Sequence, residues 1–201
     1  MTELLVPNHA LVLLIGAAGA GKTTVAARHF PPDAVLSSDA FRARFGTGEA
    51  DQTATRTAFA ALHRELEGRL AAGRLTVIDA TNVTAGARSA LVRRGRAAGR
   101  PVVAIVLDLP ADIVLGRNAA RGATTSEGGG RSVPEVAVRR HLDTLASVTD
   151  RRLLAEGIAR VCRLRTPAEV ARLRVVFDPQ AGSRTRPKGR ARSSTQTPLR
   201  R

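Results

Sequence analysis

The residues best suited to chemistry lie at positions 16–23, where the sequence reads GAAGAGKT. This is the G-x-x-x-x-G-K-[ST] spacing of a Walker A motif, in which backbone amides turn inward around phosphate oxygens and a helix start adds positive potential. Lys22 can reach the β- and γ-phosphates, and the Thr23 hydroxyl can bind Mg²⁺. The residues expected to surround ATP are Gly16, Ala17, Ala18, Gly19, Ala20, Gly21, Lys22, Thr23 and Thr24.

A second motif, LTVIDATN at 75–82, is a hydrophobic strand that ends in an acid, as in a Walker B motif. A buried strand of this kind delivers its carboxylate beside the phosphate loop, where it can hold Mg²⁺, directly or through water. Taken alone, Asp79 could instead cap the following turn. With a Walker A motif upstream, the metal role is favoured, so Thr23 and Asp79 are the predicted Mg²⁺ ligands.

The segment SSDAFR, at 37–42, follows another apolar run. Ligands of parallel α/β folds bind at the carboxyl ends of the strands, so Asp39 would face the pocket and could take a proton from an attacking hydroxyl. Arg42 lies three residues further on, and its planar guanidinium suits a phosphate on the acceptor. Spacing alone supports two roles for Asp39 equally, a general base and a helix N-cap.

Arg117 and Arg121 lie four residues apart, on one face of a predicted helix, just before the glycine-rich segment 122–130. That segment has the composition of a mobile lid, and arginines at a lid can neutralise charge on a transferring phosphoryl group. From the residues alone, an exposed basic helix face is the favoured interpretation of the pair. The four histidines show no metal-ligand spacing, and Cys162 is assigned to the core.

Short apolar runs that alternate with helical patterns must position these residues. The runs are typical of buried strands, and their alternation with helices predicts a three-layer α/β fold with a central parallel sheet. The predicted strands are 10–15, 34–38, 75–79, 102–107 and 159–164.

Several signals mark the intervening helices. Apolar residues at helical spacing run from Phe59 to Leu70, and Pro110 is suited to the first turn of a helix toward Gly122. The capping-box spacing occurs twice before helical runs. The two pairs are Ser132 with Glu135 and Thr166 with Glu169.

The chain has 201 residues, 43% of them hydrophobic, which is enough for one domain, predicted at 1–178. The formal net charge is +15; the segment 179–201 holds seven basic residues and no acid, which leaves +8 for residues 1–178. We expect a disordered basic tail at 179–201 and a phosphate-rich partner. With one cysteine, no positively charged leader before the first apolar run and no membrane span, the expectation is a soluble, cytoplasmic protein without membrane contact.

Together, these motifs resemble the kinase domain of bacterial polynucleotide kinase-phosphatase, an ATP-dependent 5′-hydroxyl polynucleotide kinase. The resemblance covers about residues 10–176 and follows the family's order and spacing. The matching stretches are LVLLIGAAGAGKTT, VLSSDAFR, EADQTATRTAFAALH, GRLTVIDATNV and GRNAAR.

The resemblance implies that Lys22 and Thr23 hold ATP and Mg²⁺, and that Asp39 is the general base for the 5′-hydroxyl. It also implies that Arg42 grips a neighbouring phosphate of a DNA or RNA acceptor, and that the arginine pair of GRNAAR binds the ATP phosphates. Two alternatives stay open, namely a small-molecule kinase on the same fold and a nucleic-acid-binding ATPase without an acceptor. The number of subunits in the functional protein is left open.

Overall fold

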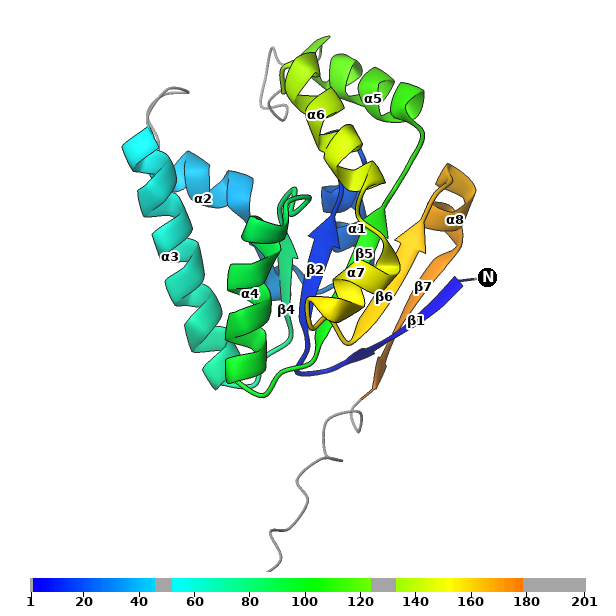
Figure 1. Ribbon diagram of the computed structural model, residues 1–201. Helices are drawn as coiled ribbons and strands as arrows, with labels where there is room; N and C mark the ends of the chain where they lie inside the picture. Colours follow the sequence, from blue (N-terminus) through cyan, green and yellow to red (C-terminus); the bar gives the residue numbers. More distant parts are fainter. Residues whose placement is uncertain (1, 46–51, 124–132, 179–201) are drawn as a thin grey trace, which may run out of the picture.

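The computed structural model describes residues 2–45, 52–123 and 133–178 (Figure 1). The predicted basic tail and nearly all of the predicted glycine-rich lid lie outside this part of the chain. Within the described residues, no helix is both long and apolar enough to cross a membrane.

The centre of the molecule is a five-stranded, wholly parallel sheet with the strand order β3-β4-β2-β5-β6. All five strands expected from the sequence are confirmed, with bounds that differ by no more than one residue. The strands are β2 (Leu11–Ile15), β3 (Val35–Ser37), β4 (Thr76–Asp79), β5 (Val102–Leu107) and β6 (Arg160–Leu164).

Helices cover both faces of this sheet and complete the predicted three-layer α/β architecture (Figure 1). Helices α3, α4 and α7 pack on one face, whereas α1 and α5 pack on the other. The helices are α1 (Lys22–His29), α2 (Ser38–Phe45), α3 (Gln52–Ala71), α4 (Ala85–Ala97), α5 (Ala111–Ala123), α6 (Glu135–Ala146), α7 (Asp150–Ala155) and α8 (Pro167–Arg172), with a 3₁₀ turn, η1, at Pro32–Ala34.

Strand β2 shows why its sequence is apolar throughout. Leu11, Leu13 and Ile15 belong to the core on the α3–α4 face, and Val12 and Leu14 belong to the core on the α1 face. All five side chains are fully buried, as expected for the central strand of a parallel sheet with helices on both sides. The phosphate-binding motif therefore follows a fully buried central strand.

A second sheet was not anticipated from the sequence. Strand β1 (Thr2–Pro7) pairs in parallel with β7 (Leu173–Asp178). The pair packs on the α1 face, where the rings of Phe30 and Phe177 meet edge to face, with their centroids 6.0 Å apart. Both segments mix charged and apolar residues, so neither has the continuous apolar pattern that identified the other strands.

The two predicted capping boxes have different outcomes. At α8, Thr166 and Glu169 form the box in full, with each side chain accepting a hydrogen bond from the other residue's backbone amide. At α6 the prediction was wrong, because Pro134 is the N-cap and Glu135 is therefore the first helical residue, two positions too early for a box with Ser132. The carboxylate of Glu135 instead pairs with Arg139, one turn further on.

Candidate functional site

The loop between β2 and α1 requires glycine at two positions. Gly19 and Gly21 adopt positive φ angles of 86° and 95°, which side chains rarely permit. At Gly19 the space is also closed, since a Cβ atom there would lie 2.4 Å from the carbonyl oxygen of Val114 on α5. The loop thus packs directly against α5, which carries the predicted lid arginines.

The loop leaves backbone amides open toward the cavity in front of it. The amide of Gly16 donates to the carbonyl oxygen of Thr81 (3.0 Å), and the amide of Ala20 donates to that of Ala17 (3.2 Å). Within the described part of the chain, the amides of Gly19, Gly21 and Lys22 have no such acceptor. Amides left open at the first turn of a helix, here α1, form an anion-binding site.

Thr23 and Asp79, predicted from separate motifs, are in direct contact. The Thr23 hydroxyl donates to Asp79 Oδ2 at 2.8 Å. This contact follows from the sheet order, because β4 pairs directly with β2 and its last residue, Asp79, therefore ends beside the first turn of α1. The cap role considered for Asp79 is not used, since α4 begins instead at Thr84, whose hydroxyl accepts from the amide of Ala87.

The oxygen pair formed by Thr23 and Asp79 suits Mg²⁺, which prefers hard oxygen ligands and is usually held by one or two protein groups plus phosphate oxygens. Burial raises the pKa of Asp79, while the Thr23 hydroxyl and Lys22 act to lower it. A divalent cation would favour the charged carboxylate in the same way. Among the described residues, no cluster of three or more His, Cys, Asp or Glu side chains could form an all-protein metal site.

Lys22 lies over the loop itself. Its Nζ donates to the carbonyl oxygens of Gly16 (3.0 Å) and Ala17 (2.8 Å). The pKa of Lys22 is lowered to about 8, mainly by burial and in part by Arg121, while Asp79 and Asp39 act to raise it. The two carboxylates thus do not fully offset the burial of the amine, and the phosphates of a nucleotide would supply further negative charge.

Helix α2 carries the two residues predicted to handle the acceptor. Asp39 lies in its first turn, and Arg42 Nη2 donates to Asp39 Oδ1. The N-cap alternative for Asp39 is not supported, because the side chain that accepts from the helix start is that of Ser37, which receives a 3.4 Å hydrogen bond from the amide of Ala40. With its side chain 79% exposed, Asp39 is accessible to a ligand.

One cavity of about 450 Å³ brings the predicted residues together. The phosphate loop, the end of β4 and the start of α2 form its walls, and α5 and α6 complete it. Of the predicted site residues, those that line it are Ala18, Gly19, Gly21, Lys22, Thr23, Asp39, Arg42, Asp79 and Arg121. Gly16, Ala17, Ala20 and Thr24 belong to the loop and the first turn of α1 but do not line this cavity.

Of the predicted arginine pair, Arg121 lines the same cavity and Arg117 does not. Arg121 is partly buried in its wall and acts on the pKa values of both Lys22 and Asp79. Arg117 is exposed, and its Nη1 is 3.7 Å from the point where a Cβ of Gly21 would lie. Both arginines therefore reach the phosphate loop, although the lid segment expected to follow them lies outside the described residues.

His141, on α6, also lines the cavity and was missed by the sequence analysis. Its Nδ1 is buried and has no hydrogen-bond partner among the described residues. Burial and the nearby charges of Lys22 and Arg140 lower the pKa of His141, so the imidazole is neutral at neutral pH. No motif surrounds this histidine; only the packing of α6 beside α5 brings it to the site.

The loop after Asp79 is held from behind by residues that the sequence did not single out. Asn82, with a φ of 50°, donates from Nδ2 to the carbonyl oxygen of Leu14 at 2.8 Å. The buried Arg88 of α4 donates to the carbonyl oxygens of Asn82 (3.0 Å) and Val83 (2.7 Å) and binds both carboxylate oxygens of Glu156. This arrangement, which we call the Arg88 clasp, fixes the end of β4 against α7.

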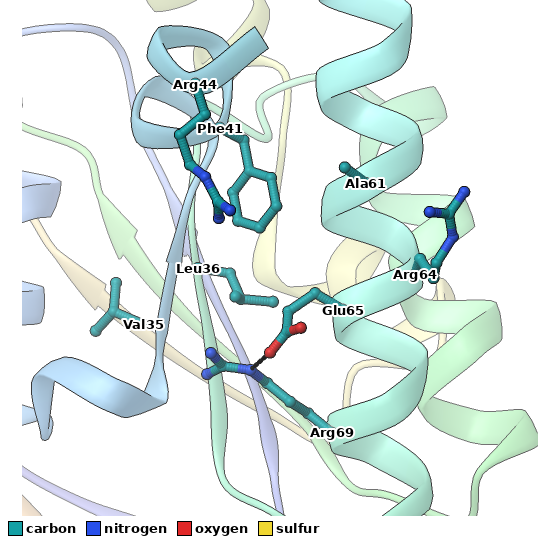
Figure 2. Close-up of a pocket in the computed structure, with 8 residues that line it drawn as sticks. All are labelled: Val35, Leu36, Phe41, Arg44, Ala61, Arg64, Glu65 and Arg69. Carbon is teal, nitrogen blue, oxygen red and sulfur yellow. Dashed lines mark hydrogen bonds and ion pairs between the residues drawn. The ribbon is translucent and has the colours of Figure 1, made fainter.

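Helix α2 separates the cavity from a second groove, shown in Figure 2. Phe41 and Arg44 extend from α2 into this groove, with the Arg44 guanidinium 5.7 Å from the centre of the Phe41 ring. From α3, Arg69 pairs with Glu65, and the Arg64 head group points away from Phe41. Phe41 thus lies on the opposite side of α2 from Asp39 and Arg42.

The fold, the open amides and the Thr23–Asp79 contact define a P-loop domain of the kinase-like type. The sequence profile of the AAA domain family matches residues 11–151, and the chain belongs to that family. None of the curated protein sequences matches it.

Solved structures share the fold. One is a chain of the Pnkp1/Rnl/Hen1 RNA repair complex, with a TM-score of 0.58 and 23% identity; the match covers 70% of this chain and 45% of that one. Another is a putative kinase from Chloroflexus aurantiacus j-10-fl, with a TM-score of 0.53 and 18% identity over 80% of this chain and 90% of that one. A third is the AvrRxo1-ORF1:-ORF2 structure with ATP, with a TM-score of 0.53 and 19% identity over 74% and 50%. The present chain therefore spans less than half of the RNA repair chain that it matches.

Proposed function

We propose that this chain is an ATP-dependent kinase that transfers the γ-phosphate to the 5′-hydroxyl of a polynucleotide. The observation that carries the proposal is the position of Asp39 and Arg42, which line the same cavity as Lys22, Thr23 and Asp79. A carboxylate and a guanidinium side by side, facing a phosphate-binding loop, supply a base and an anchor for a phosphate-bearing acceptor.

In the reaction, the acceptor's hydroxyl oxygen bonds to the γ-phosphorus as the bond from that phosphorus to the β–γ bridging oxygen breaks. Asp39 accepts the hydroxyl proton, and the loop amides with Lys22 hold the nucleotide phosphates. Arg121 and Arg117 offset the negative charge that spreads over the transferring group. Mg²⁺, held by Thr23 and Asp79, would neutralise phosphate charge at the same place.

Arg42 has two partners in this scheme. In the structure it donates to Asp39. To grip the phosphate next to the reacting hydroxyl, it must release the carboxylate, which is then free to take the proton. Acceptor binding and activation of the base are thus linked through one side chain.

Two structural relatives fit this proposal at the level of the fold. The Pnkp1-containing structure is described as an RNA repair complex, and another neighbour was solved with ATP. The main alternative is a small-molecule kinase on the same fold, since the fold alone does not decide the acceptor. An ATPase without an acceptor would leave Asp39 and Arg42 without a role.

A panel of acceptors with γ-labelled ATP tests the proposal. We expect label on 5′-hydroxyl oligonucleotides and nucleoside 3′-phosphates, and little on plain nucleosides or sugars. The contact with Arg42 is of a type worth about 1.5–3 kcal/mol, or roughly ten- to a hundredfold in kcat/KM, so Arg42→Ala should erase the preference for a 3′-phosphate. If a neutral small molecule is labelled and no phosphate-bearing nucleoside is, the small-molecule kinase replaces this proposal.

A further inference from the structure

A third cavity lies between helices α3 and α4, next to the end of β4, and has a volume of about 270 Å³. We call it the α3–α4 pocket. Its lining is mostly apolar, in contrast to the charged cavity described above. The residues that matter for the argument are Phe59, Leu62, His63, Ala80, Ala87 and Leu91.

The α3–α4 pocket adjoins the cavity that holds the phosphate loop. Ala80, the residue directly after Asp79, lines both. A ligand whose reacting group lies near Asp79 and Asp39 can therefore extend past Ala80 into the pocket. The two cavities differ in chemistry, since one offers charge and the other offers apolar surface.

Phe59 is the unusual residue of this pocket. The sequence places it on the same helical stripe as Leu62, Leu66 and Leu70, yet those leucines are buried while Phe59 is 38% exposed. Its ring lies beside that of His63, with the centroids 6.5 Å apart. Burial and the neighbouring Arg94 lower the pKa of His63, against the effect of Glu67, so this wall carries no charge at neutral pH.

We propose that the α3–α4 pocket binds the nucleobase of the acceptor nucleotide that presents its 5′-hydroxyl to Asp39. This inference rests on the proposed kinase function and narrows its substrate class. An apolar pocket with an exposed aromatic ring favours a planar base, which stacks on such rings without regard to its identity. A sugar, by contrast, would lose hydrogen bonds with water there and find few partners.

Two matched acceptors test the pocket directly. One is a nucleoside 3′-phosphate, and the other is the corresponding abasic 1-deoxyribofuranose 3-phosphate, which keeps the furanose ring, the 5-hydroxyl and the phosphate but lacks the base. With wild-type protein, γ-labelled ATP should be transferred to both, and kcat/KM should be roughly ten- to a hundredfold higher for the acceptor with the base. Phe59→Ala should bring the two values together by lowering only that of the base-bearing acceptor.

Two further variants separate the pocket from general effects. Ala87→Phe adds a ring at an exposed position of the pocket wall, so it should exclude the base while it leaves transfer to the abasic acceptor intact. Phe41→Ala removes the same side chain from the groove on the other side of α2, so the preference for the base should remain. Thermal melting of each variant checks that it is folded.

The outcomes distinguish this inference from the function on which it rests. If wild-type protein labels both acceptors equally, or if Phe59→Ala keeps the preference for the base, the base does not bind in this pocket although the kinase proposal stands. If wild-type protein labels neither acceptor, the polynucleotide kinase proposal itself fails.

Discussion

At the scale of single residues, the protonation of Lys22 can be measured directly. In the free protein the pKa of Lys22 is about 8, because burial disfavours the ammonium form. Nucleotide phosphates favour that form, so the pKa rises on binding and, above pH 8, binding takes up a proton. By linkage, the affinity for ATP should be independent of this group below pH 8 and should fall as the pH rises through and beyond it, approaching tenfold per pH unit.

Calorimetric titration with ATP between pH 7 and 9.5 measures this dependence. A Lys22→Met variant should bind ATP more weakly and show no fall near pH 8, because it lacks the titrating amine. Its turnover should drop by ~10²-fold or more, through lost contacts with the transferring phosphate. An equal fall in affinity in the Lys22→Met variant would show that another group titrates.

The role of Asp39 as a base is separable from any role in helix capping. Asp39→Asn keeps the size of the side chain but removes the proton acceptor, so kcat should fall ~10²–10⁴-fold with little change in ATP affinity. Its stability should change by less than about 0.5 kcal/mol, because the carboxylate is exposed and pairs only with Arg42 among the described residues.

Ser37→Ala provides the matched control at the same helix. The Ser37 hydroxyl accepts from the start of α2, so its removal should lower the free energy of unfolding by about 1 kcal/mol and leave the chemistry largely intact. Denaturant titration gives the free energy of unfolding of both variants, and steady-state kinetics give their kcat. If Asp39→Asn instead lowers the stability and keeps the activity, Asp39 is the N-cap of α2 and not the base.

At the scale of elements, the Arg88 clasp joins the loop after β4 to the end of α7. Arg88→Met would leave two carbonyl oxygens and the Glu156 carboxylate without their donor, a loss of the kind that costs about 3–5 kcal/mol when the partner is buried. We expect the midpoint of chemical denaturation to fall accordingly. Asp79 precedes this loop, so activity should fall as well.

Arg139→Met is the matched control for the clasp, because the Arg139–Glu135 ion pair on α6 is exposed on both sides. Its loss should cost no more than about 0.5 kcal/mol. Similar destabilisation by the two substitutions would mean that the clasp contributes no more than a surface ion pair.

Among the secondary-structure elements, the sequence analysis predicted those that a local sequence pattern marks. Four of the five central strands are mainly apolar, and the Walker A and Walker B spacings lie next to two of them, so the Thr23–Asp79 contact followed once these two strands were neighbours in a parallel sheet. Phe59, Arg88 and His141 were beyond reach for different reasons. Phe59 keeps the helical spacing of a core residue but lies past the edge of the core, and Arg88 and His141 gain their surroundings only from helices distant in the sequence.

At the scale of the whole molecule, the predicted site residues gather at one edge of the central sheet. The carboxyl ends of β2, β3 and β4 bring the phosphate loop, the start of α2 and Asp79 to one edge of the sheet, where two of the cavities described above meet at Ala80. Parallel strands place all their carboxyl ends at the same edge, which is why motifs far apart in the sequence converge there.

The pairing of β1 with β7 has a consequence for how the chain is made. Because residue 2 pairs with residue 173, β1 is synthesised before the other strands of the described fold and waits for one of its last segments. The five-stranded sheet can assemble meanwhile, since all its strands lie between these two. Until β7 has been made, Leu4 and Val6, which are buried in the folded protein, lie on a strand without its partner. Synthesis that stalls before Leu173 would therefore release a chain with an intact phosphate loop and an unpaired β1 strand, a form prone to aggregation.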